Sequence, residues 1–184
     1  MNNKKKEWEE SYTRKENFLF HPHEEIVKFA SRNVKKRTDV ENFKPSSSLP
    51  TNRKETVLDL GCGIGRHIIF FHELGSDIYG VDLSQEAINF AVDWALKVGM
   101  INPHQKILQS DIRKLPWEDK FFDFAVSHGV LDSMNFSIAR ESVKELNRVM
   151  KKGGKFYCDL ISGDDSTKFK NCCLASVKNV HGVF

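Results

Sequence analysis

Residues 57–66 read VLDLGCGIGR, and this stretch decides the fold. A short run of strand formers comes first, three glycines at Gly61, Gly63 and Gly65 follow at once, and apolar residues at helical spacing continue to Leu74. A glycine at a strand-to-helix turn adopts backbone conformations closed to other residues and lets a ligand approach the main chain and the positive end of the helix. We therefore expect the main ligand site at this turn.

Strands and helices alternate outward from the turn. The predicted strands are residues 56–60, 78–81, 106–109, 122–126 and 155–161. The predicted helices are residues 64–74, 84–98 and 138–152, the last one ended by Gly153 and Gly154. Parallel strands need a crossover connection, so the alternation predicts an α/β protein with a parallel sheet and helices on both faces.

The composition fits one folded domain with an N-terminal leader. The chain has 184 residues, 40% of them hydrophobic and 29% charged, with 14 Phe, and its four cysteines form no C-x-x-C pair. We expect residues 1–54 to form a helical leader or lid and a linker, and residues 55–184 to form the main domain. No apolar run is long enough for a bilayer and no secretory signal is visible, which predicts a cytoplasmic protein without a membrane partner.

The glycine spacing narrows the choice of ligand. A dinucleotide-binding turn would need glycine or alanine at Arg66, and no P-loop sequence occurs. Asp59 would repel a pyrophosphate but would suit an amino or sulfonium group. Asp82 ends the second strand, where an acidic residue accepts hydrogen bonds from ribose hydroxyls, and Asp111 ends the third strand, where it could border an adenine amino group.

These motifs resemble those of class I S-adenosylmethionine-dependent methyltransferases. The resemblance runs from Val57 to Ile161, and its parts occur in the family's order. It rests on residues 57–67, 79–84, 109–112, 115–123 and 145–155. It implies S-adenosylmethionine as the cofactor and a Rossmann-like, open, mainly parallel sheet.

The resemblance also implies roles for the residues along the turn and the next strand ends. Gly61, Cys62 and Gly63 would touch the methionine portion of the cofactor, and Asp59 would meet its amino group. Asp82 would hold the ribose hydroxyls.

Further roles follow for residues around the adenine and the methionine group. Leu83 would lie beside the adenine, Asp111 would take its amino group and Ile112 would make a neighbouring backbone contact. Ser127 would flank the methionine group. In the leader, Trp8 and Tyr12 resemble an aromatic pair that can close over the cofactor, although an amphipathic helix that buries two aromatics would look the same.

His128 is the candidate catalytic residue. It follows the fourth predicted strand, next to the cofactor, where it could act as a base if the acceptor must lose a proton. A histidine that hydrogen-bonds the cofactor or the backbone would fit the same position. His21 and His23 could join it around a metal ion, but a turn with exposed histidines explains them as well, so we expect no metal.

The last part of the usual architecture is not recognisable. Only 23 residues follow Ile161, with no clear pair of strands, so the chain is expected to be truncated or to have shortened final strands. Either case leaves an exposed sheet edge, which would favour self-association.

Three functions compete. We favour methyl transfer to a small molecule, because short loops join the strands and no macromolecule-binding module is visible. Residues 1–54 carry 13 Lys and Arg against 8 Asp and Glu, so an RNA methyltransferase that uses this basic leader is the alternative, although nucleic acid is not the expected partner. A non-catalytic cofactor-binding or interaction protein is the third possibility.

Overall fold

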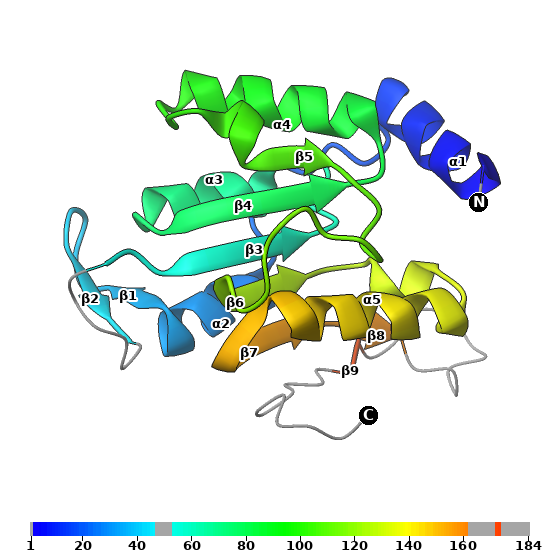
Figure 1. Ribbon diagram of the computed structural model, residues 1–184. Coiled ribbons are helices and arrows are strands. Elements are labelled where there is room, and N and C mark those ends of the chain that lie inside the picture. The colour runs from blue at the N-terminus through cyan, green and yellow to red at the C-terminus, as the bar shows by residue number, and fades with distance from the viewer. Residues whose placement is uncertain (1, 47–52, 162–171, 174–184) are drawn as a thin grey trace.

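The computed structural model describes residues 2–46, 53–161 and 172–173. Its centre is a parallel five-stranded sheet with the order β5-β4-β3-β6-β7 (Figure 1). These strands are β3 (Thr56–Leu60), β4 (Asp77–Asp82), β5 (Ile107–Gln109), β6 (Phe122–Ser127) and β7 (Met150–Cys158). The predicted α/β class and Rossmann-like sheet are thus confirmed.

The strand order reverses beside β3. The chain passes from β3 to β4 and β5 on one side, and then crosses to β6 and β7 on the other side. In the register, Asp59 of β3 lies between Gly80 of β4 and Val126 of β6. A reversal of this kind opens a crevice at the carboxyl ends of the strands, which is where ligands bind in such sheets.

Helices cover both faces of the sheet, as predicted. One apolar core joins α2 (Glu24–Asn33), α3 (Arg66–Glu73) and α4 (Gln85–Lys97) to the sheet, and the other core includes residues of α5 (Phe136–Val149). Side chains alternate between the two faces along a strand, so Val57 belongs to the first core and Leu58 to the second. Both are fully buried.

The start of α3 shows why the third glycine of the turn is needed. Gly65 has φ +92°, and a Cβ there would lie 3.0 Å from the Cβ of Ala91 on α4. Its small size and its left-handed backbone let α3 pack closely on α4. The next helix begins as predicted at Ser84, whose side chain accepts a hydrogen bond from the backbone N–H of Ala87 at 3.2 Å.

The N-terminal leader, which the sequence predicted to be helical, contains α1 (Asn2–Thr13) and α2. Ile26 and Ala30 of α2 are fully buried in the same core as the sheet. An antiparallel hairpin of β1 (Lys35–Arg37) and β2 (Phe43–Pro45) follows, within the stretch for which the sequence predicted only the leader and a linker. The hairpin escaped prediction because each strand has only three residues, too few for a pattern.

The region around β7 corrects a second boundary. Helix α5 ends at Val149 and β7 begins at once with Met150, so Gly153 and Gly154 lie inside the strand instead of ending the helix. Pairing with β6 shifts register between Phe122 and Phe124, so residues 151–154 form an irregular excursion. Buried Met150 extends the apolar pattern of the helix into the strand, which hides the boundary in the sequence.

The predicted fifth strand is divided in two. After β7, the short β8 (Leu160–Ile161) pairs antiparallel with β9 (Cys172–Cys173). Most of the residues after Ile161 lie outside the described part, so self-association through a sheet edge stays a prediction. No helix within the described ranges combines the length and the apolar character needed to cross a membrane. Two short 3₁₀ helices complete the fold, η1 (Pro103–Gln105) and η2 (Leu131–Ser133).

Candidate active site

A cavity of about 450 Å³ lies at the carboxyl ends of β3, β4 and β6, where the strand order reverses. Helix α1, the glycine turn and the segments after β4, β5 and β6 form its walls. The predicted site residues that line it are Tyr12, Gly61, Cys62, Gly63, Asp82, Leu83, Asp111, Ile112 and His128. The fold thus gathers residues more than a hundred positions apart into one cavity.

The glycine turn is tightly enclosed. Gly61 has φ +78° and Gly63 has φ +52°, a region that disfavours side chains. A Cβ on Gly61 would lie 2.3 Å from Cγ2 of Val130, and a Cβ on Gly63 would lie 2.7 Å from the hydroxyl of Tyr12. Cys62 between them is buried, which raises the pKa of its thiol well above the usual value, so it lines the cavity as a neutral group.

Asp82 is fixed at the end of β4 by backbone donors. Its Oδ2 accepts from the N–H of Gly63 and its Oδ1 from the N–H of Ser84, both at 2.9 Å. Burial raises the pKa of Asp82 to about 6, although these hydrogen bonds act in the opposite direction. Each carboxylate oxygen can accept further bonds, so the group is oriented to receive two hydroxyl donors from the cavity.

Asp59 and Ser127 are placed differently from the other predicted residues. Both have only 1% exposure, and neither lines the cavity in the described structure. The Ser127 hydroxyl donates to the backbone oxygen of Leu60 at 3.1 Å and so ties β6 to β3. The oxygens of Asp59 accept no hydrogen bond from any described residue, and Nδ1 of His67 lies 3.5 Å from Oδ2.

Asp111 lines the cavity but already has a partner. Arg113 donates to both of its oxygens, and the closest pair, Nη2 to Oδ2, is 2.6 Å apart. This hydrogen bonding lowers the pKa of Asp111 despite partial burial. A ligand amino group would therefore share the carboxylate with Arg113, which also lines the cavity.

Helix α1 brings two aromatic residues to the cavity, as the sequence predicted. Trp8 and Tyr12 both line it, with ring centroids 6.2 Å apart. Burial and the nearby carboxylate of Asp82 raise the pKa of Tyr12, so its phenol stays protonated. The helix is attached to α4 through Glu9, whose Oε1 accepts from the backbone N–H of Glu86 at 3.3 Å.

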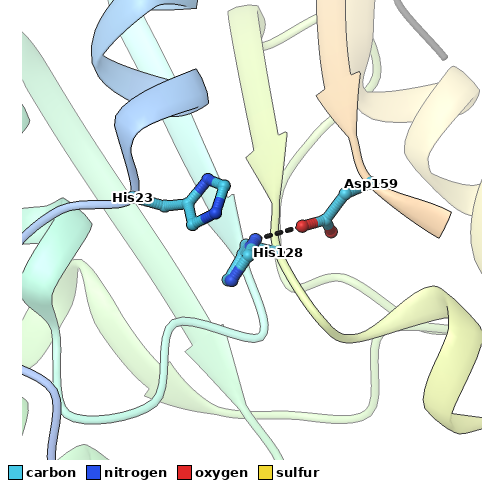
Figure 2. Close-up of side chains that lie close together, drawn as sticks. All are labelled: His23, His128 and Asp159. Carbon is cyan, nitrogen blue, oxygen red and sulfur yellow. Dashed lines mark ion pairs between the residues drawn. The ribbon is translucent and has the colours of Figure 1, made fainter. Parts of the chain in front are cut away.

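His128 lies beside a carboxylate and beneath a second imidazole (Figure 2). Its Nδ1 forms an ion pair with Oδ2 of Asp159, which follows β7. The His23 ring stacks on it with centroids 3.9 Å apart and planes at 27°. His67 on α3 stands edge-on, with its ring centroid 6.2 Å from that of His128.

The geometry of these rings bears on the metal question. One donor atom each from His23, His128 and Asp159 lies within 4.8 Å of the others. A metal ion binds along the lone pair of an imidazole nitrogen, in the plane of the ring. Because the two rings are stacked, with planes at 27°, their in-plane lone pairs do not converge on one point, and the arrangement does not favour a metal centre.

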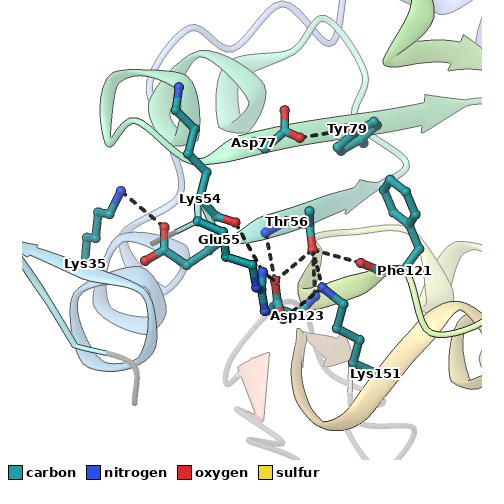
Figure 3. Close-up of polar contacts among 10 residues, drawn as sticks. Lys35, Lys54, Glu55, Thr56, Asp77, Tyr79, Phe121, Asp123 and Lys151 are labelled. Carbon is teal, nitrogen blue, oxygen red and sulfur yellow. Dashed lines mark hydrogen bonds and ion pairs between the residues drawn. The ribbon is translucent and has the colours of Figure 1, made fainter. Parts of the chain in front are cut away.

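The opposite edge of the sheet holds a different polar cluster (Figure 3). Asp123, at the start of β6, accepts from Arg53 at 2.6 and 2.7 Å, from the hydroxyl and N–H of Thr56, and from Lys151 at 3.1 Å. Burial would raise the pKa of Asp123, but these donors overcome it and hold the pKa well below its usual range. Nearby, Lys35 pairs with Glu55 at 3.2 Å.

Sequence reasoning missed several residues of the site. Arg66 lines the cavity with a half-buried guanidinium, which donates to the His21 backbone oxygen over a long 3.4 Å. His67 and Asp159 were also missed. The polar Arg66-His67 pair at the start of an otherwise apolar helix was an available signal for the first two, whereas Asp159 carries none, because an acid after a strand is common.

The cavity has the features that a sulfonium-bearing nucleoside requires. Gly61, Cys62 and Gly63 form a glycine cradle that lines the cavity, and Asp82 offers oriented acceptors there. Asp59 on β3 is a buried carboxylate that accepts no hydrogen bond from the described residues. The positive charge of an amino or sulfonium group on a ligand would compensate the buried negative charge of Asp59. Fold and site together define the class of S-adenosylmethionine-binding α/β proteins.

Comparison with known proteins identifies the family. Residues 58–158 match the family described as Methyltransferase domain, so the chain belongs to that family. It is 32% identical to a sterol 4-C-methyltransferase of Caenorhabditis elegans, over 60% of this chain and 33% of that protein. It is 28% identical to a demethylmenaquinone methyltransferase of Staphylococcus aureus, over 70% of this chain and 52% of that protein.

The fold comparison agrees. A SAM-dependent methyltransferase from Methanosarcina mazei superposes with a TM-score of 0.55 and 27% identity, covering 61% of this chain and 55% of that chain. The chain thus spans between a third and about half the length of these relatives. S-adenosylmethionine is the cofactor that this family uses, in agreement with the expectation from the sequence.

Proposed function

We propose that this protein transfers the methyl group of S-adenosylmethionine to a small-molecule acceptor. The observation that carries the proposal is the convergence of the glycine cradle and the oriented carboxylate of Asp82 at one cavity, with the buried carboxylate of Asp59 on the neighbouring strand. The two named relatives act on a sterol and on demethylmenaquinone, which supports a small acceptor. The covering helix α1 supports it too, because Trp8 and Tyr12 narrow the access that a macromolecule would need.

Different residues of the site contact different parts of the cofactor. Gly61, Cys62 and Gly63 receive the methionine portion, and Asp82 receives the ribose hydroxyls. Asp59 attracts the amino group, through water because the side chain does not line the cavity.

The remaining predicted contacts concern the adenine and the edges of the cofactor. Leu83 packs beside the adenine, Asp111 accepts from its amino group, and Ile112 makes a neighbouring backbone contact. Ser127 acts through the backbone, since its hydroxyl is bonded to Leu60. Arg66 has free donors at the cavity wall and suits the methionine carboxylate.

The contribution of the chain is chiefly positional. Bound S-adenosylmethionine supplies a methyl group on a positively charged sulfur, which an acceptor displaces in line. The cradle and Asp82 hold the donor at two separate points, and α1 closes the cavity with two aromatic rings. Fixing both reactants in a water-poor site contributes most of the rate gain for such a displacement.

Titration calorimetry with S-adenosylmethionine and S-adenosylhomocysteine tests the proposal. We expect both to bind at one site per chain, and transfer of a labelled methyl group into a small-molecule fraction should follow. Absence of binding would contradict the proposal and favour a non-catalytic interaction protein. Salt-sensitive retention of RNA, with label appearing in RNA, would favour the RNA methyltransferase that the basic leader suggested.

A further inference from the structure

Two histidine-aspartate pairs lie side by side near the cavity. His67 faces Asp59 across 3.5 Å, and His128 forms an ion pair with Asp159. His23 connects the pairs, because its ring stacks on His128 while its backbone N–H donates to Nε2 of His67 at 3.3 Å. Each pair consists of one histidine and one aspartate, but the pairs differ in whether Nε2 of the histidine already accepts a hydrogen bond.

Only His128 has a free nitrogen at the cavity. In His67, Nε2 already accepts the His23 N–H, so its lone pair is used. In His128, Nδ1 faces the carboxylate and so carries the proton in the neutral ring, which leaves Nε2 as an acceptor. No described residue hydrogen-bonds that nitrogen, and His128 lines the cavity, whereas His23 and Asp159 do not.

Asp159 is positioned to stabilise His128 when this residue takes up a proton. Asp159 is 4% exposed, and its Oδ1 accepts the Gly129 N–H at 2.9 Å, which fixes the carboxylate. Burial would raise the pKa of Asp159, but the bonds from His128 and Gly129 lower it, so the group stays ionised. Burial also lowers the pKa of His23, so the stacked ring adds no competing charge.

The charged groups around His128 come from three elements. Asp159 follows β7, His23 precedes α2, and Arg66 and His67 begin α3. Asp159 is the only one of them in an ion pair with His128, and it stabilises the positive charge that proton uptake creates.

The segment that follows His128 adds both apolar and polar side chains to the cavity wall. Val130, Met134 and Ile138 are apolar, Ser133 and Asn135 are polar, and Leu19 adds a further apolar side chain from the segment between α1 and α2. The apolar side chains offer contact surface to an acceptor whose body is apolar.

We infer that His128, oriented by Asp159, is the catalytic base that removes the proton from a phenol- or enol-type hydroxyl on an otherwise apolar acceptor. The inference rests on the proposed function and names its substrate class. In the step, the O–H bond breaks and its proton moves to Nε2 of His128. The oxygen forms a bond to the methyl carbon, and the carbon-sulfur bond breaks with its electron pair left on sulfur. The proton then passes to solvent.

A hydroxyl is the acceptor that gains most from such a base. A phenolic hydroxyl has a pKa of about 10 and is almost wholly protonated at neutral pH, whereas a thiol, with a pKa near 8.5, already ionises in part. A neutral amine attacks through its own lone pair and needs no prior deprotonation. A positioned base contributes about 10² to 10⁴-fold in rate, which matches the need of the hydroxyl.

The first test is the tautomer of His128 in the full chain, read by ¹⁵N NMR with labelled histidine and bound S-adenosylhomocysteine. We expect the proton on Nδ1 and a bare Nε2 in the neutral ring. Asp159→Asn should remove this preference, while exposed His104 should not change between the two proteins. A proton on Nε2 in the wild-type protein would overturn the inference.

The second test uses 4-nitrophenol, whose phenolate absorbs visible light. With S-adenosylhomocysteine bound, no methyl transfer can occur, so the spectrum reports proton transfer alone. At a pH below the probe's own pKa, the wild-type protein should raise the phenolate signal, and His128→Gln should abolish the rise. A wild-type protein that gives no rise, or a rise that survives in His128→Gln, would contradict the inference.

Calorimetry separates the two proposals. We expect the wild-type protein to bind S-adenosylhomocysteine, which the proposed function requires and the role of His128 does not. Intact binding together with a failed tautomer or phenolate test would overturn only the role of His128. Failure of the wild-type protein to bind S-adenosylhomocysteine would overturn the proposed function and this inference with it.

Discussion

Buried carboxylates at the two edges of the sheet differ in their hydrogen-bond partners and in the direction of their pKa shifts. At the amino edge, Asp123 has donors from Arg53, Thr56 and Lys151, and its pKa lies well below the usual range. At the carboxyl edge, burial raises the pKa of Asp82 to about 6, and Asp59 accepts no hydrogen bond from the described residues. At the amino edge the polar groups bond one another and stabilise the fold, whereas at the carboxyl edge they remain available to a ligand.

The largest effect is expected at the glycine cradle. Gly63→Val should weaken S-adenosylhomocysteine binding at least about a hundredfold, roughly 3 kcal/mol, because the branched side chain would collide with Tyr12 and fill ligand space. Calorimetry measures the loss, and circular dichroism should show the helices intact. Gly99→Val is the matched control, since Gly99 also has positive φ (+82°) but no atom within 4 Å. Equal losses in both variants would show that backbone strain, and not the cradle, is responsible.

The next effect concerns the amino edge. Asp123→Ala should lower the free energy of unfolding by about 2 to 3 kcal/mol, because Arg53 and Lys151 lose their shared partner. Their exposure, 37% and 33%, keeps the loss below that of a fully buried pair. Urea unfolding measures it, with Asp119→Ala as the control, since Asp119 is 70% exposed in its pair with Arg148. Ligand affinity should not change. A loss of affinity would show that Asp123 also supports the ligand site and would contradict the distinction between the two edges.

At the carboxyl edge, Asp82→Ala should weaken cofactor binding by about 1 to 3 kcal/mol through lost charged hydrogen bonds to the ribose. Asp111→Ala should cost less, because Arg113 already shares that carboxylate. Titration of both variants with S-adenosylhomocysteine gives the order. An unchanged affinity in Asp82→Ala would remove this residue from the site.

The smallest expected effect is a difference in how the free energy of unfolding changes with pH. The pKa of Asp123 is depressed, so its contribution is present above about pH 4 and is lost as the pH falls further. The pKa of Asp82 is raised to about 6, so the folded state binds the extra proton, and stability should fall as the pH rises from about 4 to about 6. Urea unfolding of Asp123→Asn below about pH 4, and of Asp82→Asn between about pH 4 and 6, should each show the loss of one of these slopes. Equal slopes in the two variants would contradict the opposite environments.

The sequence predicted the carboxyl edge better than the amino edge. The glycine turn, Asp82 and the alternation of strands are local patterns, and the parallel topology brings the strand ends together without further information. Asp123, Arg53 and Lys151 come from separate segments and make their contacts only after folding. Nothing in the sequence around Asp123 distinguishes it from a solvated acid.

Contacts of single side chains were harder to predict than the position of the site. Ser127 stays a predicted neighbour of the cofactor, but its hydroxyl donates to the Leu60 backbone oxygen, a contact that the sequence does not indicate. The stack of His23 on His128 also could not be predicted, because it depends on how the segment before α2 crosses the end of β6. Contacts of this kind are set by tertiary packing, for which a single sequence holds no periodic signal.

A crystal structure of the full chain with S-adenosylhomocysteine tests the central claim most directly. The account predicts the methionine portion along Gly61 and Gly63 and the two ribose hydroxyls on the carboxylate of Asp82. A ligand seated elsewhere, with Asp82 bonded only to Gly63 and Ser84, would contradict it.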